Sequence, residues 1–220
     1  MMLVLERARC PARRMCASPH GFDDRARPMT PSTRHLIARD ALAYRALMLD
    51  AYARHPDAFT SSVDERAALP IAWWEARLGG GAPASSIVLA ALDAERIVGV
   101  AGLSFESRSK ARHKASLFGM YVPAAFRGCG IGRALVATVL EHARARSGVM
   151  LVQLTVTDGN APARTLYERF GFVAFGVEPF AVAVDGGYVS KVHMWCNLAN
   201  HVESRSVRPE RLTPPRACAR

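Results

Sequence analysis

Residues 128–132 read Gly-Cys-Gly-Ile-Gly and separate two segments of different periodicity. The segment before them, Ala115 to Val122, is largely apolar, as is typical of a buried strand. After them, apolar residues recur at Ile131, Leu135 and Val139, which is the spacing of one helix face. This order of strand, glycine turn and helix restricts the chain to folds in which a sheet strand passes directly into a covering helix.

The glycine turn has two interpretations. Because no side chains stand in the way, its backbone N–H groups can approach an anion, and the helix behind it adds the positive end of its dipole. Arg127 and Arg133 flank the turn with positive charge, so the turn fits a pyrophosphate. A tight turn into a helix also needs glycine without any ligand, and the turn alone favours both interpretations equally. Its spacing, Gly-x-Gly-x-Gly, matches neither the P-loop nor the dinucleotide fingerprint.

The charge of the chain is concentrated at its two ends. The 220 residues are 50% hydrophobic and 22% charged, which suits one globular domain with a sizeable core, and the formal net charge is +10. Six arginines in residues 1–32 and five in 197–220 supply most of the excess. We expect a disordered extension over 1–31 and a disordered basic tail over 199–220. Because no basic stripe with interleaved aromatic residues is present, the pattern favours solvated arms over a nucleic-acid surface.

Cysteine usage and hydropathy argue against several further classes of protein. Five scattered cysteines without a CxxC pair indicate neither a disulfide framework nor a zinc site. No His, Cys and carboxylate cluster has metal-ligand spacing, so no metal is expected. No run of about 18 apolar residues indicates a membrane span. These features predict a cytoplasmic protein without a membrane partner.

The remaining periodicities predict a mixed α+β domain over residues 32–198. Strands are expected where apolar runs lie between turn residues, and helices where a 3.6-residue period follows a capping residue. The expected strands are 33–39, 86–93, 96–106, 115–122, 150–156, 172–175 and 188–198. The expected helices are 41–54, 63–69, 70–78, 131–146 and 161–170. The early strands form an antiparallel meander, and the helix after the glycine turn makes a right-handed parallel crossover.

Two motifs together carry a resemblance to a known family. The segment Arg127-x-x-Gly130-x-Gly132 resembles the acetyl-CoA pyrophosphate motif of the GNAT superfamily of N-acetyltransferases. After 28 further residues, Asn160-x-x-Ala163-x-x-Leu166-Tyr167-x-x-x-Gly171-Phe172 is similar to the second motif of that superfamily. The resemblance covers residues 33–198. It implies a mixed, mostly antiparallel sheet of about six to seven strands, flanked by helices and splayed at the cofactor site.

The resemblance implies an acetyl-CoA site between the strand before the glycine turn and the strand after the following helix. The strand backbone would meet the pantetheine arm and polarise the thioester carbonyl, and the turn would bind the pyrophosphate. Asn160 would contact the pantetheine side of the cofactor. The implied cofactor-binding residues are Met120, Tyr121, Val122, Arg127, Gly128, Cys129, Gly130, Ile131, Gly132, Arg133, Asn160, Ala163, Arg164 and Tyr167.

The resemblance also implies the catalytic residues. Tyr167 would protonate the CoA sulfur, although a buried core aromatic explains the same residue on the sequence alone. Members that acetylate ribosomal-protein N-termini place a glutamate where this chain has Thr155, which cannot accept a proton at neutral pH. Glu106 is the first candidate for the base, although a solvated strand-end carboxylate explains this residue equally well. A water chain without a single base is a further alternative. The weaker candidates are Glu178, His113 and Asp158.

We therefore expect transfer of the acetyl group of acetyl-CoA to a primary amine, in a small molecule or at a protein N-terminus, by direct attack in a ternary complex. A catalytically weak CoA-binding sensor or regulator is the alternative, because Thr155 replaces the glutamate. A nucleic-acid-associated protein acting through its arginine tails is a third hypothesis. The loops 55–70, 106–114 and 176–188 are expected to select the amine. A homodimer formed through an exposed last strand is a further alternative, because an exposed edge strand can pair with another chain.

Overall fold

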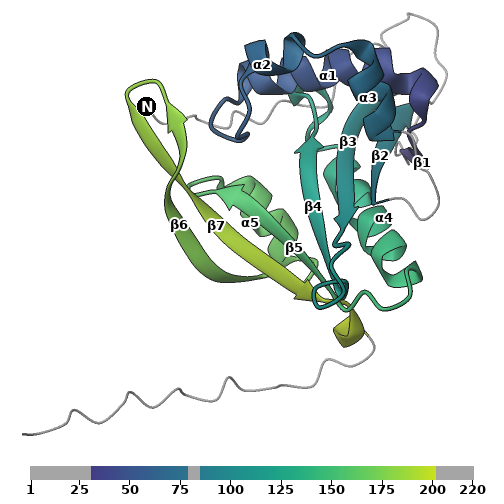
Figure 1. The fold of residues 1–220 in the computed structure, drawn as a ribbon, viewed down its shortest axis with the longest axis vertical. Coiled ribbons are helices and arrows are strands. Elements are labelled where there is room, and N and C mark those ends of the chain that lie inside the picture. Colours follow the sequence, from purple (N-terminus) through teal and green to yellow (C-terminus); the bar gives the residue numbers. More distant parts are fainter. Residues whose placement is uncertain (1–30, 79–84, 202–220) are drawn as a thin grey trace, which may run out of the picture.

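The computed structural model describes residues 31–78 and 85–201, which form an open seven-stranded sheet with helices on both faces (Figure 1). The strand order is β1-β2-β3-β4-β5-β7-β6, and only the neighbours β4 and β5 run parallel. The strands are β1 (Ser32–His35), β2 (Ser86–Asp93), β3 (Arg96–Phe105), β4 (Lys114–Tyr121), β5 (Leu151–Thr157), β6 (Val173–Val184) and β7 (Gly187–Asn197).

The helices divide the core into two parts, one on each face of the sheet. One face of β2 and β3 packs on α1 and α3 through residues such as Tyr44 and Trp74. The other face of the sheet packs on α4 and α5, and the cluster there includes Leu135 of α4 and Tyr167 of α5. In Figure 1, α1, α2 and α3 lie together at one end of β4, with α4 behind the sheet. The helices are α1 (Ala41–Arg54), α2 (Val63–Ala67), α3 (Ile71–Leu78), α4 (Ile131–Ala145) and α5 (Ala161–Glu168).

The expected mixed, mostly antiparallel sheet is confirmed, as are the five helices to within a few residues at their ends. The first strand ends at His35, earlier than expected, and a short 3₁₀ turn (Ala38–Asp40) precedes α1. The predicted extensions fall almost entirely on residues 1–30 and 202–220, which lie outside the described residues. Across the described ranges, no helix is long and apolar enough to cross a membrane.

The largest difference from the sequence prediction is the length of β6. We expected a strand of residues 172–175 followed by a loop, whereas β6 runs for 12 residues and forms a long hairpin with β7. Gly176 and Pro179 indicate a loop locally, but β6 is an edge strand, where a missing N–H and irregular pairing are tolerated. The pairing shifts register twice, between Ala174 and Gly176 and between Glu178 and Val182, so the strand absorbs these residues as bulges.

Candidate active site

A wedge opens between β4 and β5 (Figure 1). The two strands pair in parallel over three positions only, from Lys114 opposite Leu151 to Ser116 opposite Gln153. Beyond Ser116 the ladder ends and the strands diverge, so the backbone of β4 that faces β5 loses its strand partner. Such a split in a sheet exposes N–H and C=O groups that an extended amide-bearing chain can pair with.

A bulge in β4 deepens the wedge. On its other edge, β4 pairs with β3 so that Phe118 lies opposite Gly102 and Tyr121 opposite Val100. Three steps along β4 therefore match two along β3, and Gly119 adopts a left-handed φ of 58° at the extra residue. The bulge turns the backbone of Met120 and the following residues relative to the rest of the strand.

The glycine turn leaves the N-terminal end of α4 uncapped by side chains. Gly128 and Gly130 have φ values of 79° and 80°, and a Cβ on either one would meet no other atom of the described residues within 4 Å. Gly130 is the N-cap residue and makes no side-chain capping bond, and the first turn of α4 holds no acidic residue. The first N–H groups of α4 have no intrahelical acceptor, so this end of the helix can bind a pyrophosphate.

The two flanking arginines differ in what they do. Arg133 is exposed beside the turn. Arg127 instead points back into the fold: its Nε donates to the carbonyl oxygen of Val122 at 2.9 Å, and its Nη2 lies 2.9 Å from Nε2 of His55. The side chain of Arg127 therefore braces the end of β4 against the loop after α1, and only its backbone faces the turn. Cys129 Sγ lies 3.7 Å from the carbonyl oxygen of Arg127, inside the turn.

The second motif forms the opposite wall of the wedge. Asn160 Oδ1 accepts a hydrogen bond from the N–H of Ala163 at 3.2 Å and so caps α5. Arg164 pairs with Glu168 on the exposed side of that helix. Tyr167 is buried, and its hydroxyl donates to Sδ of Met120 at 3.3 Å. Burial raises the pKa of Tyr167 to about 12, which keeps the hydroxyl protonated at neutral pH.

The structure places Glu106 far from Tyr167. The N–H of Glu106 donates to the carbonyl oxygen of Lys114, at the closed end of the wedge. Met120, which Tyr167 contacts, is six residues further along β4, a distance of about 20 Å. The Glu106 carboxylate pairs with Arg108 at 3.2 Å and lines a cavity of about 460 Å³. Tyr167 and Glu106 are thus not brought together.

The three weaker candidates for the general base also lie apart from one another. His113 accepts backbone hydrogen bonds from Met150 and Leu151 through its carbonyl, at the closed end of the wedge. The carboxylate of Asp158 accepts from the N–H of Gly159 at the open end. Glu178, on β6, lies 3.0 Å from Nε2 of His193.

A buried lysine ties the loop after α1 to the open end of β5. Lys191 Nζ donates to the carbonyl oxygens of Asp57 and Ala58, both at 2.9 Å, and to Oγ1 of Thr157 at 2.8 Å. Thr157 Oγ1 in turn donates to the Asp57 carbonyl oxygen. Burial lowers the pKa of Lys191, and the nearby Asp57 and Glu178 oppose that shift. This loop is thereby held over the mouth of the wedge.

Sequence reasoning missed Lys191 and His193. A period-2 reading of β7 would have placed Lys191, His193 and Trp195 on one face. No local signal gives their partners, because these lie on β5, β6 and the loop after α1. Within the described ranges, no group of three or more His, Cys, Asp or Glu residues has a geometry that could hold a metal ion.

Comparison with known proteins identifies the family of the chain. A family model described as the acetyltransferase (GNAT) family matches residues 46–172. The chain is 33% identical over 142 residues to a mycothiol acetyltransferase of Brachybacterium faecium, a match that covers 63% of this chain and 39% of that protein. It is 28% identical over 121 residues to the L-amino acid N-acetyltransferase AaaT of Escherichia coli, covering 55% and 73% of the two chains.

Solved structures share the fold. A GNAT-family acetyltransferase from Streptococcus pneumoniae superposes with a TM-score of 0.69 at 24% identity, covering 76% of this chain and 98% of that one. The putative acetyltransferase yncA from Salmonella typhimurium, solved with its cofactor acetyl-CoA, gives a TM-score of 0.64 at 22% identity, covering 86% and 99%.

Proposed function

The chain belongs to the acetyltransferase (GNAT) family, and from this premise we propose that it transfers the acetyl group of acetyl-CoA to a primary amine by direct attack in a ternary complex. The observation that carries the proposal is the wedge between β4 and β5, with the open helix end of the glycine turn at one side and the Tyr167 hydroxyl inside it. Acetyl-CoA supplies an activated thioester as the acyl donor.

The residues present fit this cosubstrate. The N–H groups that begin α4, from Ile131 to Arg133, would hold the pyrophosphate, since no carboxylate opposes it in that turn and no Cβ obstructs it at Gly128 or Gly130. The unpaired edge of β4 beyond Ser116 would pair with the pantetheine amides. Met120, Tyr121 and Val122 would present backbone N–H groups to the carbonyl oxygen on which negative charge develops.

Tyr167 is assigned the acid role. The only hydrogen-bond acceptor of its hydroxyl among the described residues is a thioether sulfur, which is a weak one. A thiolate is a much stronger acceptor and would take over this hydrogen bond. The raised pKa keeps the proton on the hydroxyl until the thiolate forms.

The acceptor amine is proposed to approach from the face that the loop after α1 covers. Lys191 holds that loop, and the β6–β7 hairpin borders the same opening. L-amino acids are the first acceptors to test, because the relative AaaT is named for them and matches over 73% of its own length.

The test is an assay of thiol release from acetyl-CoA. The acceptors are the 20 L-amino acids, short aliphatic diamines and a peptide with a free N-terminal alanine, and the affinity for acetyl-CoA is measured in parallel by calorimetry. We expect amine-dependent thiol release together with binding of acetyl-CoA. Binding without release for every amine would contradict the transferase assignment and favour a CoA-binding sensor.

A further inference from the structure

His193 lies directly opposite Thr155 in the antiparallel pair of β5 and β7. Residues opposite each other in such a pair point to the same face, with Cβ atoms about 5 Å apart. Thr155 is exposed on that face, and it occupies the position where the family resemblance implies a glutamate in some members. A basic side chain therefore stands next to a position where this chain lacks a proton acceptor.

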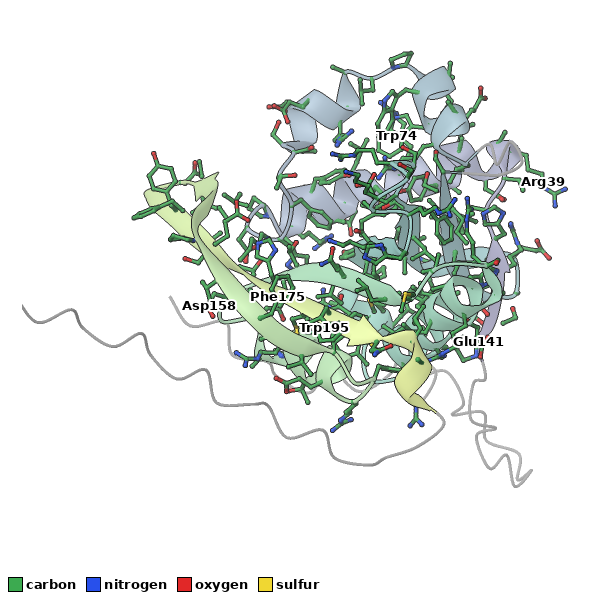
Figure 2. All side chains as sticks on the ribbon, turned by 60° about the horizontal axis from the view of Figure 1, so that its bottom comes forward. Arg39, Trp74, Glu141, Asp158, Phe175 and Trp195 are labelled. Carbon is green, nitrogen blue, oxygen red and sulfur yellow. The ribbon has the colours of Figure 1, made fainter. Side chains whose placement is uncertain are left out.

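Glu178 orients the ring of His193. Its Oε2 lies 3.0 Å from Nε2 of His193, and 34% of the histidine side chain is exposed. Phe175 packs edge-on against the same ring with centroids 5.9 Å apart. Figure 2 shows Phe175 on β6 close to Trp195 on β7, the strand that carries His193. The bulge between Ala174 and Gly176 supplies the extra residue that places Phe175 beside the ring.

The hydrogen bond to Glu178 leaves one ring nitrogen available. With Nε2–H donated to the carboxylate, Nδ1 carries the lone pair of the neutral imidazole. No hydrogen bond to Nδ1 is formed anywhere within residues 31–78 and 85–201. A carboxylate that orients a histidine while the second nitrogen stays available is the arrangement that general-base catalysis needs.

The strand register places this pair close to the level of the Tyr167–Met120 contact along the sheet. Ser116 lies opposite Gln153 in the parallel pair, so Thr155 and His193 are level with Phe118. Met120, which Tyr167 contacts, is two residues further along β4, about 7 Å. Glu106 is bonded to Lys114, which lies six residues before Met120 on β4, a distance of about 20 Å. His193 is thus much closer to the level of the Tyr167 hydroxyl than Glu106 is.

We propose that His193, oriented by Glu178, is the general base that accepts the proton of the attacking amine. This rests on the proposed function. As the N–C bond forms and the C–S bond breaks, Nδ1 of His193 takes the proton that the amine nitrogen loses, and Tyr167 gives the proton that the sulfur takes. Both residues then recover their starting protonation state from solvent. The charged groups near His193 on this face are Glu178 on β6 and Lys191 on β7 itself. The neighbouring strand β5 presents only the uncharged residues Gln153, Thr155 and Thr157.

The test compares His193→Gln and Glu178→Gln with the control His142→Gln, which lies in the last turn of α4 away from the wedge. In wild type we expect kcat/KM to fall on the acidic side as the histidine becomes protonated. His193→Gln should lower kcat/KM by about 100-fold and remove that acidic limb. Glu178→Gln should lower kcat/KM less than His193→Gln does, because the ring loses the carboxylate that orients it but keeps its lone pair. The control should keep the wild-type profile.

A second variant separates a chemical role from a structural one. His193→Ala should be rescued at least in part by added imidazole, whereas the control His142→Ala should not respond to imidazole. Unfolding temperature and acetyl-CoA affinity should match wild type in all variants. A wild-type enzyme that acetylates an amine, together with a His193→Gln variant of equal rate and unchanged acidic limb, would overturn the assignment of His193 alone. A wild type that binds acetyl-CoA but acetylates no amine of the panel would overturn the proposed function and this inference together.

Discussion

The hydroxyl of Tyr167 on α5 donates a hydrogen bond to Sδ of Met120 on β4, and the two atoms are 3.3 Å apart. This contact joins the two walls of the wedge at the level where β4 has bulged away from β3. It places a proton donor beside a sulfur atom of the protein itself.

Replacing Tyr167 by Phe removes the proposed acid. We expect kcat to fall by about 100-fold while acetyl-CoA affinity changes less than twofold, because the ring and its packing on Phe172 are retained. Steady-state kinetics and calorimetry check this. The control is Tyr44→Phe, a buried tyrosine in the core on the other sheet face, which should keep the wild-type kcat. A Tyr167→Phe enzyme with full turnover would remove the acid role.

Tyr167 also predicts the alkaline behaviour of the wild-type enzyme. Since burial raises its pKa to about 12, the hydroxyl stays protonated well above the range in which an exposed tyrosine ionises. We therefore expect that ionisation of Tyr167 causes no loss of kcat between pH 8 and pH 10. The pH profiles of the wild type and of Tyr167→Phe should have the same shape in this range. A wild-type limb near pH 9 that is missing in the variant would contradict the buried, protonated state.

Replacing Gly130 by Ala tests the anion site. The methyl group would stand in the open turn, and we expect acetyl-CoA affinity to fall about tenfold as backbone contacts are lost. The left-handed φ of 80° adds a stability cost of about 1–2 kcal/mol. Gly148→Ala is the matched control, since Gly148 has a φ of 83° and equally open surroundings outside the turn. It should show the same stability loss with unchanged affinity; equal affinity in both variants would contradict the site.

Replacing Lys191 by Met tests the clamp on the loop after α1. The carbonyl oxygens of Asp57 and Ala58 would lose their donor, and we expect the free energy of unfolding to fall by about 2–3 kcal/mol. The KM for the acceptor amine should rise more than the KM for acetyl-CoA. Denaturant titration and two-substrate kinetics measure both effects. The control is Arg144→Met, at an exposed basic residue in the last turn of α4, which should leave stability and both KM values unchanged.

The pair Arg34–Asp40 predicts an acid-sensitive contribution to stability. Arg34 binds both carboxylate oxygens of Asp40, at 2.7 and 2.8 Å, and holds the pKa of Asp40 at about 2. Because the folded-state pKa is depressed, this stabilisation is present above pH 4 and is lost as pH falls towards 2. Asp40→Asn should cost about 1–2 kcal/mol at pH 7 and much less at pH 2.

The control for that pair is the exposed pair of Arg164 and Glu168. Both side chains are 48% exposed, so Glu168→Gln should change the free energy of unfolding by less than about 0.5 kcal/mol at either pH. Chemical denaturation at the two pH values compares the variants. An Asp40→Asn cost that does not depend on pH would show that packing, rather than charge, accounts for the effect.

Much of the fold could be predicted because its signals are local. The apolar run of β4, the glycines after it and the period of α4 lie within about 30 consecutive residues, and each reports on its own backbone conformation. β6 could not be predicted to its full length, because Gly176 and Pro179 indicate a loop unless the strand is known to lie at the sheet edge.

The candidate site divides in the same way. Gly130 and Tyr167 belong to motifs whose spacing is visible along the chain, whereas the direction of the Arg127 side chain depends on His55, 72 residues away. Glu106 follows a strand, as predicted, but pairing with Lys114 places it at the closed end of the wedge. A residue's position along a strand could be predicted, but not which strand would lie beside it.

By itself the sequence determined the strand–turn–helix unit, the order of the two motifs and a family with an acetyl-CoA site, because turn chemistry and hydrophobic period act over a few residues. Only the tertiary structure decided that β4 and β5 part after Ser116, that His193 lies opposite Thr155 and that Glu178 reaches the same histidine. Those relationships depend on strand register, which is set by packing between segments far apart in the chain.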